Sequence, residues 1–356
     1  MEHVWAVRLP GGPDHLRDMP AWDVTVDLDG GRAPYATAQF KAPLAYLSED
    51  NYGLTNPRAL PVVQVDAGWR YPGAQNINTL FSGVIVERRL TVDSAGAYVQ
   101  FVAESYETIL EYPSHLAAAV NNAYTTVKQT YDALAFYRKP VWLEPASNVA
   151  PDAAALAEYR AMAVEKDDDV GDFLRTCAST MAQLLRGRMD AATPTVECIS
   201  DPYPYQRLAI LDANTFENLD RIENLEDWAN ILRLTAEWTD PSTGDTKSKR
   251  RTYYDASVTS GTGAVRSRDV TLNVKPPGGA VPPANWAPAK RWLRRVNEAS
   301  RGYWQGTCRA IWWMQPRIDG VMLTNDPFDD TGGQVQRITF LVDQGLMNIT
   351  WNVVHP

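Results

Sequence analysis

Short stretches in which apolar and polar residues alternate recur toward both ends of the chain. Such alternation is typical of strands with one buried side and one solvent-facing side. The stretches are residues 22–29, 62–65, 84–92, 99–103, 231–238, 270–274, 338–342 and 347–353. Turn-forming residues at 93–96, 240–245 and 343–345 join pairs of them, with residues 247–258 as the partner of 231–238. The pattern therefore predicts at least three β-hairpins.

Two of these stretches also predict which face is buried. In residues 84–92, Val84, Val86, Leu90 and Val92 fall on one face, and Arg88 interrupts it. In residues 22–29, the apolar face begins at Trp22. Both faces are expected to pack against the core.

The middle of the chain changes to a helical period. A short helix is expected at 105–110, and longer ones at 115–138 and from Pro151 onward. The best helical pattern runs from Val170 to Arg188, with apolar residues at i, i+3 and i+4 spacing. Another helix, capped by Asn285, is expected near 285–300.

These elements predict an α+β, β-rich fold in three parts. The first is a β domain at 1–112, the second a mainly helical domain at 113–193, and the third a β domain at 194–356 that contains the helix near 285–300. A length of 356 residues agrees with two or three domains.

Composition narrows the class of protein. The formal net charge of −9 argues against a protein that grips nucleic acid phosphates, although nucleic acid could still slide past it. The 12 Trp and 24 Pro favour strands, loops and protein contacts over a helical bundle. No apolar run has membrane-spanning length, and no signal-peptide pattern begins the chain, so we expect a soluble protein made in the cytoplasm.

Candidate catalytic residues are few, and each has a plainer explanation. Asp167–Asp169 could bind a divalent cation, but acidity at a helix start explains it as well. The acidic residues of 326–330 fit a solvated loop. Glu104 and Glu107 could be posed as paired glycosidase carboxylates, but nothing places them across a cleft. We therefore expect no catalytic residue, metal site or cofactor.

Histidine and cysteine support the same view. The histidines are His3, His15, His115 and His355, and none has a neighbour at the spacing of a metal site or a catalytic triad. The cysteines Cys177, Cys198 and Cys308 lie far apart, so we expect reduced, buried, structural thiols.

Two further clusters leave alternatives open. Trp304, Trp312 and Trp313 could form a partner interface, a core or a sugar-stacking platform, and an interface or core is favoured. The basic run Lys247–Arg251 could contact nucleic acid, but a solvated hairpin end is favoured.

Four segments, in order along nearly the full chain, resemble the phage baseplate-hub family of tail-associated proteins. The segment FSGVIVERRLTV…AYVQFVAESYETIL at 81–110 resembles its strand, turn, strand and short helix. Residues 21–43 look like its opening strands, 224–245 like the start of its second barrel, and 343–353 like its final strand. The chain looks most like a minor tail protein from a siphovirus of actinobacteria.

The resemblance implies two tail-tube-like β-barrel domains with a helical domain between them, and a homotrimer. Such a trimeric ring at the virion tail tip adapts the hexameric tail tube to a three-fold tip, with assembly in the host cytoplasm. The implied partners are the tail tube or distal tail protein, a fibre or spike protein and the tape-measure protein, while DNA passes through the lumen without specific binding. A carbohydrate- or receptor-binding adhesin is the alternative, and a cell-wall hydrolase ranks third.

Overall fold

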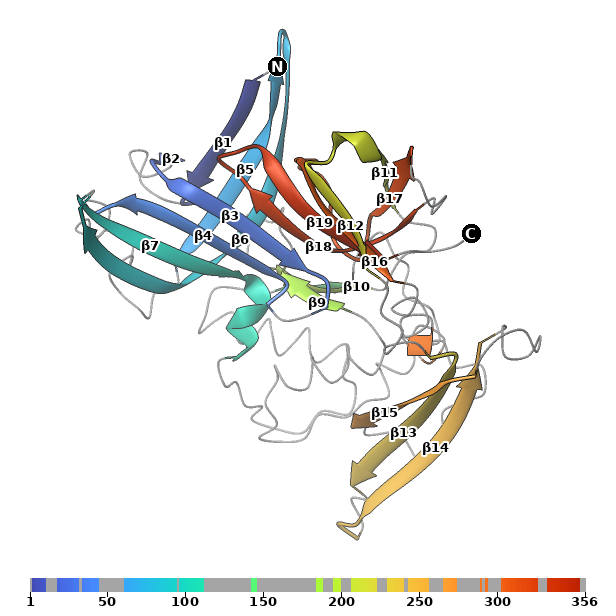
Figure 1. Ribbon diagram of the computed structural model, residues 1–356. Coiled ribbons are helices and arrows are strands. Elements are labelled where there is room, and N and C mark those ends of the chain that lie inside the picture. Colours follow the sequence, from blue (N-terminus) through green and yellow to red (C-terminus); the bar gives the residue numbers. More distant parts are fainter. Residues whose placement is uncertain are drawn as a thin grey trace.

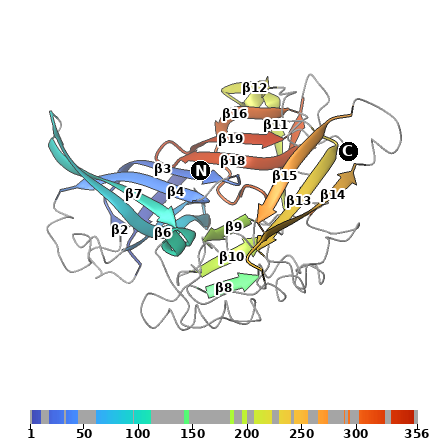
Figure 2. The same ribbon diagram turned by 90° about the horizontal axis from the view of Figure 1, so that it is seen from below.

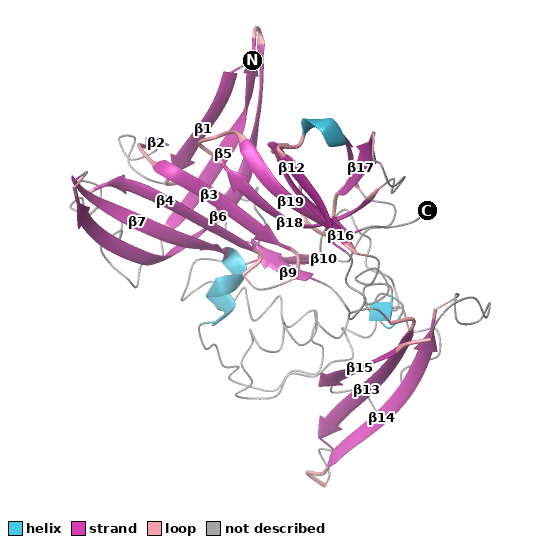
Figure 3. Ribbon diagram, in the orientation of Figure 1, coloured by secondary structure: helices cyan, strands magenta, loops and turns pink. Residues whose placement is uncertain are grey.

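The computed structural model describes most of the β-rich parts of the chain. The described residues are 2–10, 18–31, 34–44, 61–94, 96–111, 142–145, 184–187, 195–199, 206–222, 229–239, 243–255, 265–273, 289, 292–293, 302–325 and 332–352. Strands dominate them, with short helical pieces between (Figure 3). The fold is therefore β-rich, as the alternating pattern predicts.

One large sheet of 13 strands takes its strands from both ends of the chain (Figure 1). The N-terminal strands are β1 (Glu2–Arg8), β2 (Asp18–Met19), β3 (Trp22–Asp29), β4 (Ala36–Pro43), β5 (Val62–Tyr71), β6 (Ala74–Asp93) and β7 (Gly96–Ser105). The C-terminal strands are β11 (Leu208–Asp212), β12 (Asn218–Ile222), β16 (Tyr303–Arg309), β17 (Gly320–Thr324), β18 (Gly333–Leu341) and β19 (Leu346–Asn352).

The strand order shows where the two ends meet. It runs β12-β16-β19-β18-β3-β4-β7-β6-β5-β1-β2, and β17 joins β18 to β11. The joining pair is antiparallel β18 and β3, with Phe340 opposite Val26 and Ile338 opposite Leu28. The described strands form an open sheet with free edges, and no closed barrel.

A single apolar core packs against this sheet. Its members include every inward residue of the β18–β19 hairpin, and its largest fully buried side chains include Trp351, Phe40, Phe101 and Phe340. The ring centroids of Phe40 and Phe101 are 5.2 Å apart, so β4 and β7 pack through stacked side chains. Burial of this shared face explains why the two ends of the chain fold as one sheet.

Two smaller sheets accompany the large one. One has the order β8-β10-β9 and comprises β8 (Trp142–Pro145), β9 (Leu184–Gly187) and β10 (Thr195–Ile199). The other has the order β14-β13-β15 and comprises β13 (Ile231–Thr239), β14 (Thr246–Tyr254) and β15 (Ser267–Asn273). In Figure 2 the first lies between the large sheet and the second small sheet.

The predicted hairpins are confirmed, although the bounds differ. β6 spans 20 residues, so it begins well before the predicted stretch. The short helix after β7 is the 3-10 helix η3 (Tyr106–Glu111), and a second one, η4, spans Ala213–Thr215. Near 285–300, Ala289, Trp292 and Leu293 are helical, as predicted.

The predicted burial faces of β6 and β3 are wrong at irregular positions. A β-bulge between Ile85 and Glu87 shifts the alternation, so Val84 and Leu90 fall on opposite faces. Leu90 and Val92 are 58% and 75% exposed. In β3, the register shifts after Trp22, which is 39% exposed.

The helix predicted over Val170–Arg188 is wrong at its C-terminal end. Residues Leu184–Gly187 form strand β9, paired antiparallel with β10. Its partner β10 begins at Thr195, soon after β9 ends at Gly187, and the apolar pair Leu184 and Leu185 fits a helical period as well as a strand. The helices predicted at 115–138 and from Pro151 lie outside the described residues, and the three-domain division stays a prediction.

Candidate functional site

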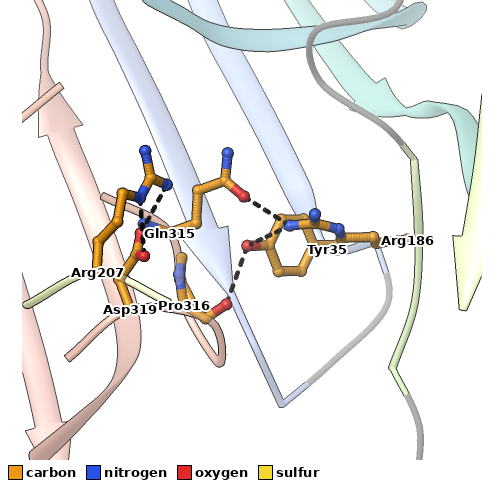
Figure 4. Close-up of polar contacts among 6 residues, drawn as sticks. All are labelled: Tyr35, Arg186, Arg207, Gln315, Pro316 and Asp319. Carbon is orange, nitrogen blue, oxygen red and sulfur yellow. Dashed lines mark hydrogen bonds and ion pairs between the residues drawn. The ribbon is translucent and has the colours of Figure 1, made fainter. Parts of the chain in front are cut away.

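The most connected polar site is a buried junction where three parts of the chain meet. We call it the polar junction, and it comprises Tyr35, Ser105, Glu107, Arg186, Gly187, Arg207, Gln315, Pro316 and Asp319. Figure 4 shows six of these residues. The residues of the polar junction come from the start of β4, the end of β7 and η3, strand β9, the position before β11, and the turn before β17.

Tyr35 lies at the centre of the polar junction and is fully buried. Its hydroxyl accepts a hydrogen bond from Arg186 Nη1 at 3.4 Å and donates one to the Pro316 carbonyl oxygen at 3.3 Å (Figure 4). Burial raises the pKa of Tyr35 to about 12, against the opposing effect of the Arg186 charge. Tyr35 therefore stays neutral and links β4 to the turn before β17.

Arg186 reaches both ends of the chain from β9. Its guanidinium carbon is 5.2 Å from the Tyr35 ring centroid, and Nη1 donates to Gln315 Oε1 at 2.9 Å. Such contacts contribute little to stability when the arginine is half-exposed, but Arg186 is only 8% exposed. The side chain therefore fixes β9 to the large sheet.

Glu107 also anchors strand β9, through hydrogen bonds to its carboxylate. Its carboxylate accepts hydrogen bonds from the Tyr35 backbone N–H at 2.5 Å, from Ser105 Oγ at 2.5 Å and from the Gly187 backbone N–H. Ser105 Oγ in turn accepts from the Ala36 N–H at 3.0 Å. Burial raises the pKa of Glu107, while these hydrogen bonds oppose that rise.

Gly187 is required by this close approach. A Cβ atom there would lie 2.5 Å from the backbone nitrogen of Tyr106 and 2.8 Å from the Glu107 carboxylate. No side chain fits at that distance, so only glycine brings its N–H to Glu107.

Asp319 forms the second anchored carboxylate of the polar junction. Arg207 binds it through two hydrogen bonds, Nε to Oδ1 at 3.0 Å and Nη2 to Oδ2 at 2.9 Å. The Gln315 N–H adds a third bond at 2.8 Å, which closes the turn before β17. Burial raises the pKa of Asp319, and the Arg207 guanidinium opposes the rise.

The contacts of the polar junction therefore connect segments of the chain to one another. Both carboxylates are buried and are satisfied by protein donors, which leaves little freedom to bind or protonate a substrate. Among the described residues no group of three or more His, Cys, Asp or Glu is placed to hold a metal ion. No helix in the described part of the chain is long and apolar enough to cross a membrane.

An aromatic cluster supports the large sheet beside the joint. His3 stacks on Trp312 with centroids 5.2 Å apart and planes 7° apart, and Trp69 lies 5.2 Å from His3. The Arg309 guanidinium carbon lies 3.9 Å from the Trp69 ring centroid. Burial lowers the pKa of His3 and so favours its neutral form within the cluster, against the opposing charge of Asp343. These contacts join β1 and β5 to the segment after β16.

The three predicted interface tryptophans have different environments. Trp304 and Trp312 are 3% and 4% exposed and belong to the core of this chain. Trp313 is partly exposed, and the Arg207 guanidinium carbon lies 4.7 Å from its ring centroid. Residues 312 and 313 lie in a turn and not in a strand.

The other candidate residues predicted from the sequence also differ in their environments. Glu104 accepts from the Thr108 hydroxyl, and Glu107 belongs to the polar junction, so these two carboxylates do not face each other across a cleft. Cys308 is buried, and burial raises the pKa of its thiol to about 12, as expected for a structural cysteine. The following candidates lie outside the described residues: Asp167–Asp169, Asp326, Asp329, Asp330, His15, His115, His355 and Cys177.

Sequence reasoning missed most of the polar junction. Tyr35, Arg186, Arg207 and Asp319 are single polar residues in unrelated segments, with no shared motif. The available signals were a lone glycine after an arginine at 186–187 and the carboxylate of Glu107 directly after a strand.

Solved structures with the same fold are phage tail proteins and a related secretion component. The tail protein from Neisseria meningitidis MC58 has a TM-score of 0.60 and 16% identity, over 99% of this chain and 96% of that one. The 43 kDa tail protein of prophage MuSo2 from Shewanella oneidensis has a TM-score of 0.59 and 12% identity, over 98% of both chains.

A third similar structure extends the comparison to secretion systems. It is the E. coli c3393 protein, a type VI secretion component described as similar to T4 bacteriophage tail proteins gp27 and gp5. Its TM-score is 0.50 and its identity 14%, over 98% of this chain and 77% of that one. No protein-family model and no curated protein matches the sequence. The chain therefore has the fold of phage tail proteins.

Proposed function

We propose that this protein is a structural phage tail-tip hub. The carrying observation is the likeness over 96–98% of the length of two phage tail proteins, which covers the whole architecture and not one shared hairpin. The polar junction also supports a structural role, because it holds three segments of the chain together without exposing a reactive group.

In this proposal, three copies form a ring with two tube-like β domains each. The ring adapts a hexameric tail tube to a three-fold tip and lets DNA pass through its lumen without specific binding. Its partners are the tail tube or distal tail protein, a fibre or spike protein and the tape-measure protein. The protein acts in the virion of a siphovirus of actinobacteria type, after assembly in the host cytoplasm.

Trp313 keeps the proposed role in a partner contact. It has accessible surface, whereas Trp304 and Trp312 serve the core of this chain. The same burial disfavours the adhesin alternative, because a sugar-stacking platform needs exposed rings. Saturated carboxylates at the polar junction disfavour the hydrolase alternative.

Mass measurement of the purified protein tests the ring. Size-exclusion chromatography with light scattering should give a trimer, alone or after addition of tail tubes. A protein that remains monomeric under both conditions contradicts the proposal. Trp313→Ala should weaken the trimer or its attachment to tubes, while Trp69→Ala, on a different element, serves as a control for general destabilisation.

A further inference from the structure

The distal part of β6 pairs with a neighbouring strand on one side only. Its pairing with β5 stops before the bulge, whereas its pairing with β7 continues to Asp93, opposite Gly96. Only two residues separate Asp93 from Gly96, so this pair must exchange its own backbone hydrogen bonds. By the alternation of an antiparallel ladder, the backbone groups of Leu90 and Val92 then point away from β7. No described strand lies on that side, which we call the β6 edge.

Strand β11 has a similar edge. Among the described strands it pairs with β17 alone. The Gly320 N–H donates to the Arg207 carbonyl oxygen at 2.9 Å, so Arg207 and every second residue after it bond to β17 in the parallel ladder. The backbone groups of Leu208 and Ile210 therefore point away from β17, and we call this side the β11 edge. Its sequence LAILD contains neither lysine nor proline, the residues that commonly block pairing at a sheet edge.

Both edges have exposed apolar side chains. Leu90 and Val92 are more than half exposed, and Leu208 and Ile210 are 48% and 68% exposed. Within each strand the two residues are two positions apart, so their side chains share one face. Outward backbone groups combined with exposed apolar side chains are typical of an edge to which another strand adds.

The two edges match each other in an antiparallel register. If Leu90 of one copy lies opposite Ile210 of a second copy, Val92 lies opposite Leu208. Each pair then joins two residues whose backbone groups point outward, so each pair can exchange two hydrogen bonds. The four apolar side chains also lie on one face of the combined sheet, where cross-strand neighbours pack together.

The antiparallel register is also better than a parallel one. A parallel pairing places an outward residue opposite an inward one, such as Leu90 opposite Ala209. The exposed apolar side chains of the two strands would then lie on opposite faces. The antiparallel register also puts Arg88, rather than a like charge, opposite Asp212.

A second copy of the chain supplies the matching edge. In Figure 1 the distal end of β6 lies at the far left of the large sheet and β11 lies at the right, so one copy does not pair them with each other. A contact between two different patches of identical subunits is heterologous, and it closes into a ring when the rotation between copies allows. Two unlike but complementary edges are what such a contact requires.

We propose that the β6 edge of one copy pairs with the β11 edge of the next copy as antiparallel strands, with Leu90 opposite Ile210. The inference rests on the proposed trimeric ring and names its subunit contact. Three such contacts continue the large sheet from each copy to its neighbour.

An engineered disulfide tests the register. The Cα atoms of a hydrogen-bonded antiparallel pair are about 5.5 Å apart, which a disulfide can bridge. The Leu90→Cys/Ile210→Cys variant, oxidised with diamide, should give a covalent trimer on a non-reducing gel. The matched control is Leu90→Cys/Val265→Cys, because Val265 is also exposed but lies next to β15 in a different sheet. This control and the unaltered protein should give monomers on the same gel.

A second variant tests the backbone pairing. Ile210→Pro removes an N–H that points away from β17, so β11 keeps its bonds to β17. The concentration at which half of the chains are monomeric, measured by light scattering, should rise by about tenfold or more. Ile210→Val keeps the N–H and an apolar side chain, so it should retain most of the trimer. Far-UV circular dichroism checks that both variants fold.

The outcomes separate this contact from the ring itself. A trimer that forms no link between positions 90 and 210 and tolerates Ile210→Pro would overturn the contact and leave the ring standing. Equal linking in the Val265 control would also overturn the contact. Covalent species of another size with the 90–210 link, identified by peptide mass spectrometry, would support the contact and contradict the trimer. A protein that stays monomeric and unlinked, with or without tail tubes, would overturn both.

Discussion

The hairpins β18–β19 and β6–β7 have a similar alternation of apolar and polar residues, but their apolar side chains differ in burial. In β18–β19, Ile338, Phe340, Met347 and Ile349 are at most 1% exposed. In β6, beyond the bulge, Leu90 lies opposite the buried Val99 and yet is 58% exposed. Both hairpins present apolar residues on the core side of the sheet, but the covering layer ends before the distal part of β6.

The contrast shows what alternation can and cannot establish. It establishes that a segment is a strand, because period two matches the pleat. Burial of the apolar face depends on what packs over it, and that comes from distant parts of the chain. Exposed apolar residues at the end of β6 suit a contact between subunits in the proposed ring.

The sharpest test of the contrast is truncation of Phe340 in β18. Phe340→Ala removes a fully buried ring from the core and should lower the free energy of unfolding by about 3–5 kcal/mol. Urea unfolding followed by tryptophan fluorescence measures the loss. A loss below about 1 kcal/mol would mean that this hairpin is no better packed than β6–β7.

The polar junction should show the next largest effect. Glu107→Ala leaves the Tyr35 and Gly187 N–H groups buried without their acceptor, at a cost of about 2–4 kcal/mol. Hydrogen exchange should rise in β9 more than in β18, because Glu107 anchors β9 directly. Uniform exchange across both strands would contradict the role of a local joint.

The pH dependence of the joint has a definite sign. Since burial raises the pKa of Glu107 above its ordinary value, ionisation is less favourable in the folded chain than in the unfolded one. The contribution of this carboxyl to stability is therefore fully present below the unfolded pKa and is lost as pH rises through the folded pKa. Glu107→Gln should lose this dependence, so the variant should gain stability relative to the unaltered protein as pH rises from 4 to 7.

The comparison of melting temperatures at several pH values measures this difference. Asp319, whose pKa burial also raises, is present in both proteins and cancels. A stability difference that is flat over this range would contradict the raised pKa of Glu107.

A smaller effect is expected from the hydroxyl of Tyr35. Tyr35→Phe keeps the buried ring but removes the hydrogen bonds to Pro316 and Arg186, and should cost about 1 kcal/mol. Thermal unfolding measures it, and Tyr71→Phe, at an exposed tyrosine, provides the control. Equal losses of stability for the two substitutions would contradict the role of the Tyr35 hydroxyl in the polar junction.

The smallest effect on the single chain is expected at the exposed end of β6. Leu90→Ser or Val92→Ser should change the free energy of unfolding by less than about 0.5 kcal/mol, because neither side chain is covered. If this surface is a subunit contact, the same changes should reduce the trimer fraction in light scattering. A large loss of stability in a monomeric protein would show that β6 is buried after all.

The sequence predicts strands much better than it predicts sites. The hairpins follow from local alternation, and the short helix after β7 follows from a local change of period. Strand β9 was predicted as the end of a helix, because its apolar pair Leu184 and Leu185 also fits the helical period of the preceding residues. The bulge after Ile85 breaks the period by one residue, so the residues predicted to share one face are divided between the two faces.

The polar junction could not be predicted for a related reason. Arg186 and Gln315 are 129 positions apart, and only the folded sheet brings them within 2.9 Å. Glu107 was recognised as a possible functional carboxylate, but its role depends on donors from Tyr35 and Gly187. Alternation along the sequence identifies strands, whereas contacts between distant segments are visible only in the folded structure.

Imaging of assembled virions by electron cryomicroscopy tests the central claim most directly. The account predicts three copies of this chain arranged around the tail axis at the tip, between the tube and the fibre or spike. A map that places the protein away from the tail axis, or in a number that is not three per tip, would contradict the hub.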